Sequence, residues 1–253
     1  MEIGWEFISL LLVTGLLAGV INTLAGGGSN LTLPALMVMG MPADVANATN
    51  RVGVVLHNLV ATHGFHQHDK LPTQDIIPIL IPTLLGGLLG AVAASYAPTY
   101  LLKPLLLGAM ISMTIMMLVR PSMIFPPEGT TPKQMAGNRS AWCWLVASGF
   151  YGGFVQAGVG FVLITALAGT LRYDLVRTNA LKVVCTLGFT LVALALFIIR
   201  GQVWWVPGLI LACGTMAGGY VAVKFAISAK PETLKWFLFV MTLCGSAAAL
   251  WLD

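Results

Sequence analysis

Apolar residues fall in ten runs along the chain, separated by short stretches that are polar or rich in glycine. The runs cover residues 8–25, 31–41, 43–63, 76–96, 100–119, 142–157, 159–170, 175–199, 203–225 and 233–252. A helix that spans a bilayer needs about 20 consecutive, mostly apolar residues, and most of the runs reach about that length. The pattern therefore predicts an all-α polytopic membrane protein.

The chain divides at its only long polar stretch, residues 120–140, which is rich in proline. This division predicts a first transmembrane repeat at 1–119, a cytoplasmic linker loop at 120–140 and a second transmembrane repeat at 141–253. Four short patterns recur in the same order in both halves, which indicates an internal duplication. They pair Gly19-Val-Ile-Asn22 with Gly153-Phe-Val-Gln156, Ala48-Thr49-Asn50 with Arg177-Thr178-Asn179, Gly86 and Gly90 with Gly214 and Gly218, and Tyr100-Leu-Leu-Lys103 with Glu232-Thr-Leu-Lys235. Such repeats are common in secondary transporters, with the substrate site at their interface.

The first helix of each half is interrupted by glycines, at 26–28 and at 158–160. Glycine is unfavourable inside a helix, and the runs that follow, 31–41 and 159–170, are too short to span a membrane unaided. Each half is therefore expected to begin with a glycine-broken helix, followed by three transmembrane helices. The broken helix either crosses the membrane or turns back as a re-entrant hairpin. The paired glycines 86/90 and 214/218 are instead interpreted as places of close helix packing.

Loop charge distinguishes the two paths, because Lys and Arg are enriched in cytoplasmic loops. If each broken helix crosses once, ten loop cations divide five to five between the two faces. If each is a hairpin, eight lie on one face and only Lys103 and Arg200 on the other. The hairpin path gives six full spans, both termini outside and the linker in the cytoplasm. Three spans per half is an odd number, so this path predicts an inverted repeat.

Composition narrows the class of protein further. Of the 253 residues, 58% are hydrophobic and 9% charged, against about 25% charged in a soluble domain, which excludes a soluble enzyme and a disordered chain. The net charge of +4 fits cations at an anionic membrane face, and no nucleic-acid partner is expected. No GxxxxGK[ST] motif occurs, so ATP-driven transport by this chain alone is excluded. The cysteines are scattered singly, and no cofactor or metal is predicted.

Polar side chains inside a membrane are costly and mark functional sites. Here they gather on the broken helices and on the helix after each. The predicted substrate-binding residues are Asn22, Ser29, Asn30, Asn47, Thr49, Asn50, Arg51, Gln156, Thr178, Asn179 and Lys182. His57 is a candidate for proton coupling, because imidazole titrates near neutral pH; a hydrogen-bonded packing role is equally open. Asp44 and Asp174 stand at the entries to the polar helices and are expected to be N-caps.

Two of these residues, Arg51 and Lys182, are cations with no Asp or Glu within a helical turn. A buried cation needs a partner, and here that partner could be a bound anion. Helical pieces opening after Gly28 and Gly160 would add backbone N–H groups and a positive dipole end to the site. The alternative is that both side chains snorkel to the membrane interface.

The glycine motif also resembles a known family. Gly19-x-x-Asn-x-x-Ala-Gly-Gly-Gly-Ser29, followed by Pro34-Ala-Leu36 and Ala46-x-Ala-Thr-Asn50, is similar to the first-repeat signature of the sulfite exporter TauE/SafE family. From Gly149-Phe-x-Gly-Gly153 onward the second half is similar to that family's second repeat, although it lacks a counterpart of Pro34. The resemblance covers nearly the whole chain. It implies secondary transport, mostly outward, of small sulfur-containing anions such as sulfite, sulfoacetate or related organosulfonates.

These observations together predict a multi-pass protein of the bacterial inner membrane that is not an enzyme. It is expected to be a secondary active transporter that exports such an anion, with coupling to protons. Its expected partners are the small anionic substrate and the lipid bilayer, and a homodimer is an open possibility. The alternatives are a permease for another small anion such as a carboxylate, a metal-cation permease, an intramembrane enzyme built on Cys185, and a membrane accessory protein. The spans carry almost no carboxylates, which disfavours the cation permease.

Overall fold

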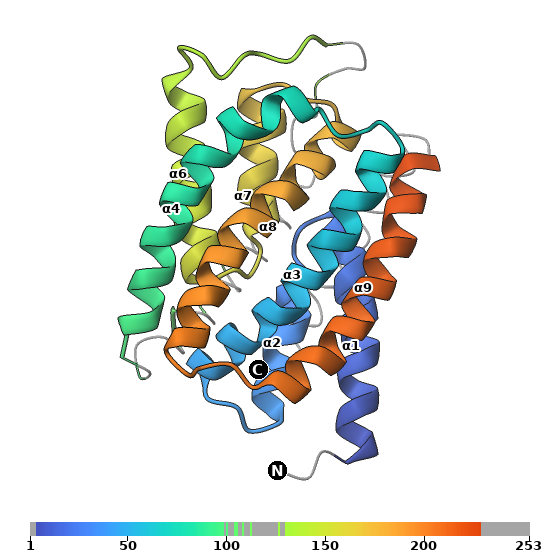
Figure 1. Cartoon of the computed structure of the whole chain (residues 1–253), viewed down its shortest axis with the longest axis vertical. Helices are drawn as coiled ribbons and strands as arrows, with labels where there is room; N and C mark the ends of the chain where they lie inside the picture. The colour runs from blue at the N-terminus through green and yellow to red at the C-terminus, as the bar shows by residue number, and fades with distance from the viewer. Residues whose placement is uncertain are drawn as a thin grey trace.

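The computed structural model of the chain describes residues 4–98 and 130–228, together with the single positions 100, 104, 105, 108, 112 and 126. The runs predicted at 100–119 and 233–252 lie outside the continuously described ranges. Within those ranges the regular structure is entirely helical, as predicted (Figure 1). The proposed division into two repeats and a linker stays a prediction.

The helices agree closely with the apolar runs. They are α1 (Trp5–Leu24), α2 (Ser29–Val38), α3 (Ala43–Gln67), the short 3₁₀ helix η1 (Thr73–Asp75), α4 (Ile76–Tyr96), α6 (Arg139–Phe154), α7 (Val159–Ile164), the π-helical turn η2 (Thr165–Thr170), α8 (Leu175–Ile199) and α9 (Trp205–Ser228). The interruptions expected at the two glycine clusters are present, between α1 and α2 and between α6 and α7. Among the residues that the structure describes, four segments are long and apolar enough to cross a membrane: α1, η1 with α4, α8 and α9.

Both broken helices fold back on themselves. Gly28 packs against the backbone of Ala18, and Leu36 near the end of α2 shares an apolar cluster with Leu11 near the start of α1. In the second half, Leu145 of α6 lies in one cluster with Leu163 of α7 and Leu167 of η2. Each pair of segments is therefore an antiparallel hairpin (Figure 1). That the hairpins are re-entrant within a bilayer, and that the halves form an inverted repeat, stay predictions.

Glycines allow two pairs of helices to pack closely. Helix α1 packs on α9, and α4 packs on α6. A Cβ atom added at Gly86 or Gly90 would strike the backbone of α6, and one added at Gly214 or Gly218 would strike the backbone of α1. The predicted role of these glycines in close packing is confirmed.

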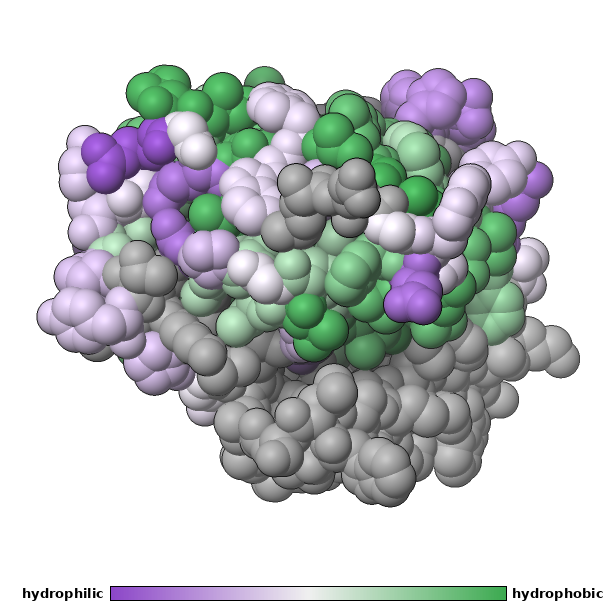
Figure 2. Space-filling view, turned by 90° about the horizontal axis from the view of Figure 1, so that it is seen from below, coloured by the Kyte–Doolittle hydropathy of each residue, from purple (hydrophilic) through white to green (hydrophobic). Residues whose placement is uncertain are grey.

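The distribution of polarity is that of a membrane protein. Leu89 and Val221 are more than half exposed, whereas the guanidinium-bearing Arg51 is fully buried. Large apolar side chains on the outside, together with a charged side chain buried among apolar clusters, are unusual in a soluble domain. The end of the molecule drawn lowest in Figure 1 carries hydrophilic and hydrophobic residues side by side (Figure 2).

The two expected N-caps have different outcomes. Asp174 is the N-cap of α8, and its Oδ1 accepts a hydrogen bond from the Arg177 amide at 2.9 Å. The expectation for Asp44 is wrong, because α3 begins at Ala43 with Pro42 in the N-cap position. Pro42 has the fixed backbone angle that suits a helix start, so Asp44 falls within the first turn. There its carboxylate accepts a hydrogen bond from the side-chain amide of Gln202 at 3.4 Å.

Candidate functional site

The two helix breaks touch each other. The carbonyl oxygen of Gly26 accepts a hydrogen bond from the amide of Gly160 at 3.2 Å. Gly26 has a φ of +91°, in the left-handed region that favours glycine. A Cβ atom at either glycine would collide with the backbone of the other. Glycine is therefore required on both sides, and the tips of the two hairpins form one unit.

Arg51 of α3 satisfies the end of α6. That helix ends at Phe154, and the last carbonyls of a helix have no partner within it. Arg51 donates from Nη1 to the carbonyl of Gly152 at 2.9 Å and from Nη2 to that of Gly153 at 2.7 Å. Nη1 also donates to Oε1 of Gln156 at 2.6 Å. The guanidinium thus binds the C-terminal end of the broken helix in the other half.

Two further contacts complete this group. Asn47, one turn before Arg51, donates from Nδ2 to the carbonyl of Phe154 at 3.0 Å. The Arg51 guanidinium lies 5.1 Å from the ring centroid of Phe197, a distance at which a cation is attracted to an aromatic face. Asn47, Arg51 and Gln156, which the sequence placed in one site, are therefore in one cluster.

Lys182 of α8 has the reciprocal role at the end of α1. Its Nζ donates to the carbonyl of Thr23 at 2.9 Å and to Oδ1 of Asn179 at 2.8 Å. Thr23 lies in the last turn of α1, which ends at Leu24. Each half therefore supplies a cation that caps the broken helix of the other half.

The burial of the two cations rules out the snorkelling alternative. Arg51 is 0% and Lys182 is 1% exposed, and both side chains point into the contact between the halves. Neither forms an ion pair with any residue in the described ranges, where Arg177 and Asp174 make the one salt bridge found. Carbonyl groups carry dipoles but no net charge. Two positive charges therefore remain without a carboxylate in this part of the chain.

The other predicted residues fall into separate places. Asn50 accepts from Thr32 Oγ1 at 2.6 Å and donates to Ser29 Oγ at 3.0 Å, so it ties α3 to the first turn of α2. Thr49 accepts from the amide of Trp204, at the entry to α9, at 3.0 Å. Asn22 and Asn30 are partly buried.

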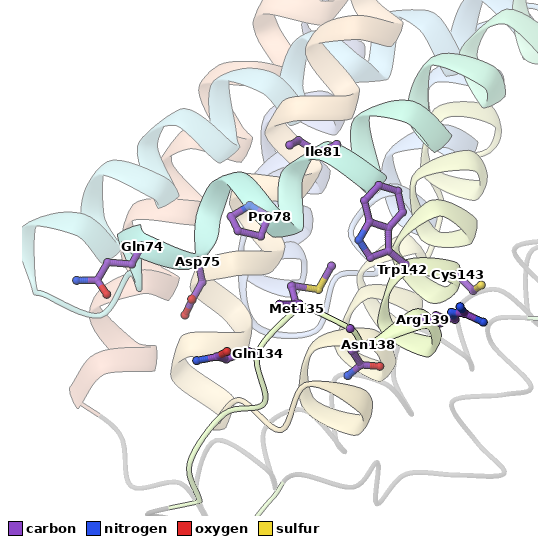
Figure 3. A pocket seen from close by; sticks show the side chains of 12 residues that line it. Gln74, Asp75, Pro78, Ile81, Gln134, Met135, Asn138, Arg139, Trp142 and Cys143 are labelled. Carbon is purple, nitrogen blue, oxygen red and sulfur yellow. The ribbon is translucent and has the colours of Figure 1, made fainter.

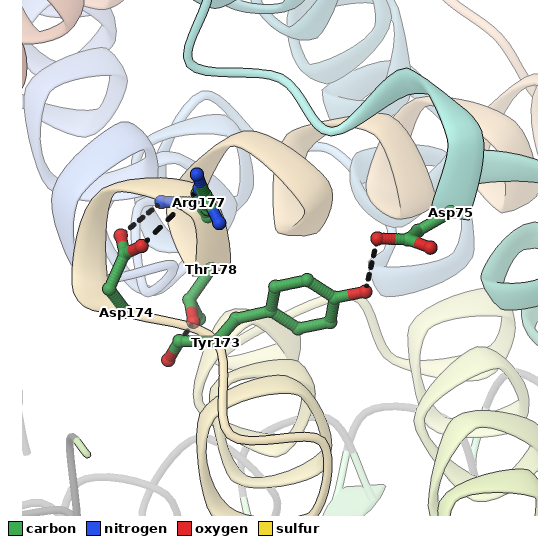
Figure 4. A network of polar contacts seen from close by, with 5 residues as sticks. All are labelled: Asp75, Tyr173, Asp174, Arg177 and Thr178. Atoms are coloured by element: carbon green, nitrogen blue, oxygen red, sulfur yellow. Dashed lines mark hydrogen bonds and ion pairs between the residues drawn. The ribbon is translucent and has the colours of Figure 1, made fainter. Parts of the chain in front are cut away.

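Thr178 lies in a polar network at the start of α8 (Figure 4). Its hydroxyl donates to the carbonyl of Tyr173 at 3.2 Å, and the Tyr173 hydroxyl donates to Asp75 Oδ2 at 2.7 Å. Burial and the hydrogen bond to Asp75 raise the pKa of the Tyr173 phenol above its ordinary value. This network joins α8 to the start of α4.

Four predicted site residues carry a buried polar atom with no hydrogen-bond partner among the described residues. These atoms are Asn30 Oδ1, Asn47 Oδ1, Arg51 Nε and Asn179 Nδ2. Buried polar groups are nearly always satisfied, so an orphaned one calls for an explanation. Two of the four, Arg51 Nε and Asn179 Nδ2, are donors on the two capping groups. An anion is the ligand that unsatisfied donors beside positive charges would bind.

His57 lies next to the first break. Its Nδ1 is 3.2 Å from the carbonyl of Thr215 in α9, and its Nε2 is 3.4 Å from Oγ1 of Thr23 in α1. His57 is fully buried. Thr23 thus contacts His57 through its hydroxyl and Lys182 through its carbonyl.

Sequence reasoning missed the backbone and several neutral residues of this region. The carbonyls of Thr23, Gly152 and Gly153 are the direct partners of the cations. The interruption of a buried helix was the available signal, because its last carbonyls must find donors elsewhere. Nothing in the sequence alone pointed to Phe197 or to Thr190, whose hydroxyl donates to Gln156 at 3.3 Å.

A separate cavity lies at the start of α4 and α6 (Figure 3). It has a volume of about 850 Å³, and its lining includes Gln74, Asp75, Arg139 and Trp142. None of the predicted substrate-binding residues lines it. In the described part of the chain, no group of three or more His, Cys, Asp or Glu side chains is placed to hold a metal ion.

A helical fold with several apolar segments and a polar interior at two facing helix breaks is the architecture of a multi-pass membrane transporter. The sequence profile described as sulfite exporter TauE/SafE matches residues 11–249. The chain belongs to this TauE/SafE family.

Similar bacterial proteins are named as probable membrane transporters. The chain is 26% identical over 249 residues to a "Probable membrane transporter protein" of Haemophilus influenzae, covering 98% of this chain and 96% of the relative. It is 25% identical to the "Probable membrane transporter protein YfcA" of Escherichia coli K12, covering 96% and 90%. It is 22% identical to the "Probable membrane transporter protein ORF9" of a Sinorhizobium species, covering 96% and 92%. The matches extend over nearly the full length of both partners.

Proposed function

We propose that the chain is a secondary active transporter that exports small sulfur-containing anions, with sulfite, sulfoacetate and related organosulfonates as the substrate class. The observation that carries the proposal is the pair of buried cations, Arg51 and Lys182, held at two touching helix breaks without a carboxylate partner in the described ranges. The name of the family, sulfite exporter, is the basis for the sulfur chemistry and the outward direction.

The chemistry around the cations supports an oxyanion. Arg51 and Lys182 contribute positive charge, and Arg51 Nε and Asn179 Nδ2 contribute buried donors that no described residue uses. Sulfite and sulfonate groups carry several oxygen acceptors on one centre, and charge-assisted hydrogen bonds to such oxygens are the strong ones. Neutral donors add hydrogen bonds without fixing the charge of the ligand, so the site suits a class of anions.

Binding of an anion would change the hydrogen bonds that cap the two broken helices. In the structure the cations donate to helix-terminal carbonyls. An anion with a full charge is a stronger partner for a cation than a carbonyl is. A bound anion would therefore compete for the groups that hold the ends of α1 and α6, which supports a substrate site at the contact between the halves.

Thermal stabilisation of the purified protein tests this proposal. The ligands are sulfite, thiosulfate, sulfate, sulfoacetate, taurine and lactate, with nickel as a cation for comparison. A ligand that binds only the native state raises stability, by about 2.7 kcal/mol at one hundred times Kd. We expect a saturable shift with one or more sulfur oxyanions and none with nickel. A shift with nickel alone would overturn the anion site.

Variants test the assignment of the cations. Lys182→Met and Arg51→Met are each expected to weaken anion binding at least tenfold in calorimetric titration, whereas Lys182→Arg and Arg51→Lys keep the charge and part of the affinity. Arg177→Met is the matched control, because Arg177 is a cation of the same helix as Lys182 and its side chain is about half exposed. Wild-type affinity in folded Lys182→Met and Arg51→Met proteins would contradict the site.

A further inference from the structure

We propose that His57 is the proton-binding site of the transporter and that its proton binds together with the anion held at Lys182. This inference rests on the proposed function, since it concerns a proton linked to that anion. It is carried by the hydrogen-bond arrangement around the His57 ring, which satisfies the ring both when it is neutral and when it is protonated.

The ring is fixed between two helices. Nδ1 faces the carbonyl of Thr215 at 3.2 Å, and a carbonyl can only accept, so Nδ1 must carry a hydrogen. In the neutral ring Nε2 then has a lone pair and no hydrogen. Gly219 of α9 packs against the ring, and a Cβ atom there would lie 2.5 Å from Nδ1. The ring is therefore held in one orientation by its surroundings.

The Thr23 hydroxyl lets the ring take either charge state. It lies 3.0 Å from the carbonyl of Gly19 and 3.4 Å from His57 Nε2, and it can donate its one hydrogen to either acceptor. When the ring is neutral, the hydroxyl donates to the lone pair of Nε2. When Nε2 carries a proton, the ring donates to both Thr215 and Thr23, and the hydroxyl turns its hydrogen to Gly19. Both charge states of His57 therefore have a complete set of hydrogen bonds.

The charged group that faces this site is Lys182. It reaches the same residue, Thr23, from α8, with Nζ 2.9 Å from the carbonyl oxygen. The groups of α1 and α9 in contact with the ring are the neutral Thr23, Thr215 and Gly219. On α3 itself, Asn58 is neutral and donates to the carbonyl of Val54. In the described ranges, therefore, no carboxylate contacts the imidazole to balance its charge.

This placement links the proton to the anion. A protonated His57 and Lys182 repel each other, so an empty site disfavours the second positive charge. An anion bound at Lys182 offsets this repulsion and favours the proton on Nε2. Linkage is reciprocal, so the proton strengthens anion binding by the same factor. The anion and the proton are therefore expected to bind together.

Calorimetric titration of the full-length protein in detergent measures this directly. The probe is sulfoacetate, or sulfate if sulfoacetate does not bind, because neither anion titrates between about pH 6 and about pH 8, where imidazole does. Titrations in buffers of different ionisation enthalpy give the number of protons taken up per anion. We expect uptake of a fraction of a proton up to one, and an affinity that falls as pH rises, by up to tenfold per pH unit.

Four variants make the test specific. His57→Gln should abolish proton uptake and flatten the pH dependence, whereas His63→Gln, at an exposed position of the same helix, should keep both. Thr23→Val removes the hydroxyl that accepts a hydrogen bond from protonated Nε2 but keeps the backbone carbonyl that binds Lys182. It should shift the loss of affinity to lower pH, and Thr23→Ser should restore the wild-type profile.

The outcomes separate this inference from the proposed function. Anion binding without proton uptake, or proton uptake that persists unchanged in folded His57→Gln, would overturn the role of His57 and leave the anion site in place. Absence of binding by every anion of the panel would overturn the proposed function and this inference with it.

Discussion

The two helix breaks have the same task but are built differently. When Gly19 is aligned with Gly153, α1 extends five residues beyond the glycine to Leu24, whereas α6 extends one residue to Phe154. The second helix thus ends four residues earlier, which is about one helical turn. The capping cation differs as well: Arg51 directly follows Asn50, whereas Lys182 comes three residues after the matched Asn179.

This difference shows which property the two breaks share. The residue type of the cation and its position in the helix differ, yet each break has a cation from the other half on its last carbonyls. Arg51 makes three hydrogen bonds, two of them to carbonyls, whereas Lys182 makes two, with one to a carbonyl. The second break is therefore the more firmly bound, and Lys182 has the lighter structural task.

The largest effect is expected where the breaks touch. Gly26→Ala adds a Cβ atom that meets the backbone of Gly160, in a left-handed conformation that L residues disfavour. Overpacking and backbone strain together should lower the free energy of unfolding by about 2–5 kcal/mol. Gly40→Ala is the matched control, since Gly40 has a φ of +85° but nothing within 4 Å of an added Cβ. Gly40→Ala should lower the free energy of unfolding by about 1–2 kcal/mol. Equal losses for the two variants, measured by denaturation in detergent, would contradict the contact between Gly26 and Gly160.

The next effect distinguishes the two caps. Arg51→Met leaves two carbonyls unsatisfied and Lys182→Met leaves one, at about 1–3 kcal/mol for each buried carbonyl. Arg51→Met should therefore lower the free energy of unfolding about twice as much as Lys182→Met. Denaturant titrations of the two purified variants without ligand check this ratio. A larger loss of unfolding free energy in Lys182→Met than in Arg51→Met would show that the first break, not the second, is the more firmly bound.

The smallest expected effect is the difference in stability between a glycine and an alanine variant, which should have opposite signs at positions 156 and 22. Gln156 has a φ of +69°, whereas its counterpart Asn22 lies within α1. Glycine should be more stable than alanine at 156 by about 1 kcal/mol, because it relieves left-handed strain. At 22, alanine should be more stable by about 1 kcal/mol, because glycine disfavours a helix interior. Melting curves of the four variants test this, and the same sign at both positions would mean that the two breaks have the same backbone.

Much of the fold could be predicted from the sequence, because hydrophobic runs and glycine clusters are local signals. The run at 76–96 coincides with α4 and the run at 175–199 with α8. The contact between Gly26 and Gly160 joins residues far apart in the chain, and no periodicity reports such a pair. The entry of α3 was misjudged at Asp44, because Pro42 also suits a helix start.

The candidate site could be predicted in its residue types but not in its arrangement. The polar faces of α3 and α8 were visible, and Asn47, Arg51 and Gln156 do come together. From the sequence, a cation without a nearby carboxylate predicts either a bound anion or a side chain that reaches the membrane interface. Backbone carbonyls could not be predicted as partners, because they have no signature in the amino-acid sequence and become available only where a helix stops. Thr49 and Thr178 share the polar pattern but serve the entries of α9 and α8.

The exchange of caps between the halves has a consequence for the order of synthesis. A ribosome makes the α1–α2 hairpin first, but the lysine that holds the tip of this hairpin follows 159 residues after Thr23. The reverse cap is ready sooner, because Arg51 already exists when Gly152 and Gly153 are made. The second hairpin can therefore be secured as it inserts, whereas the first must wait in the membrane for α8. The N-terminal half on its own should be unable to complete its fold.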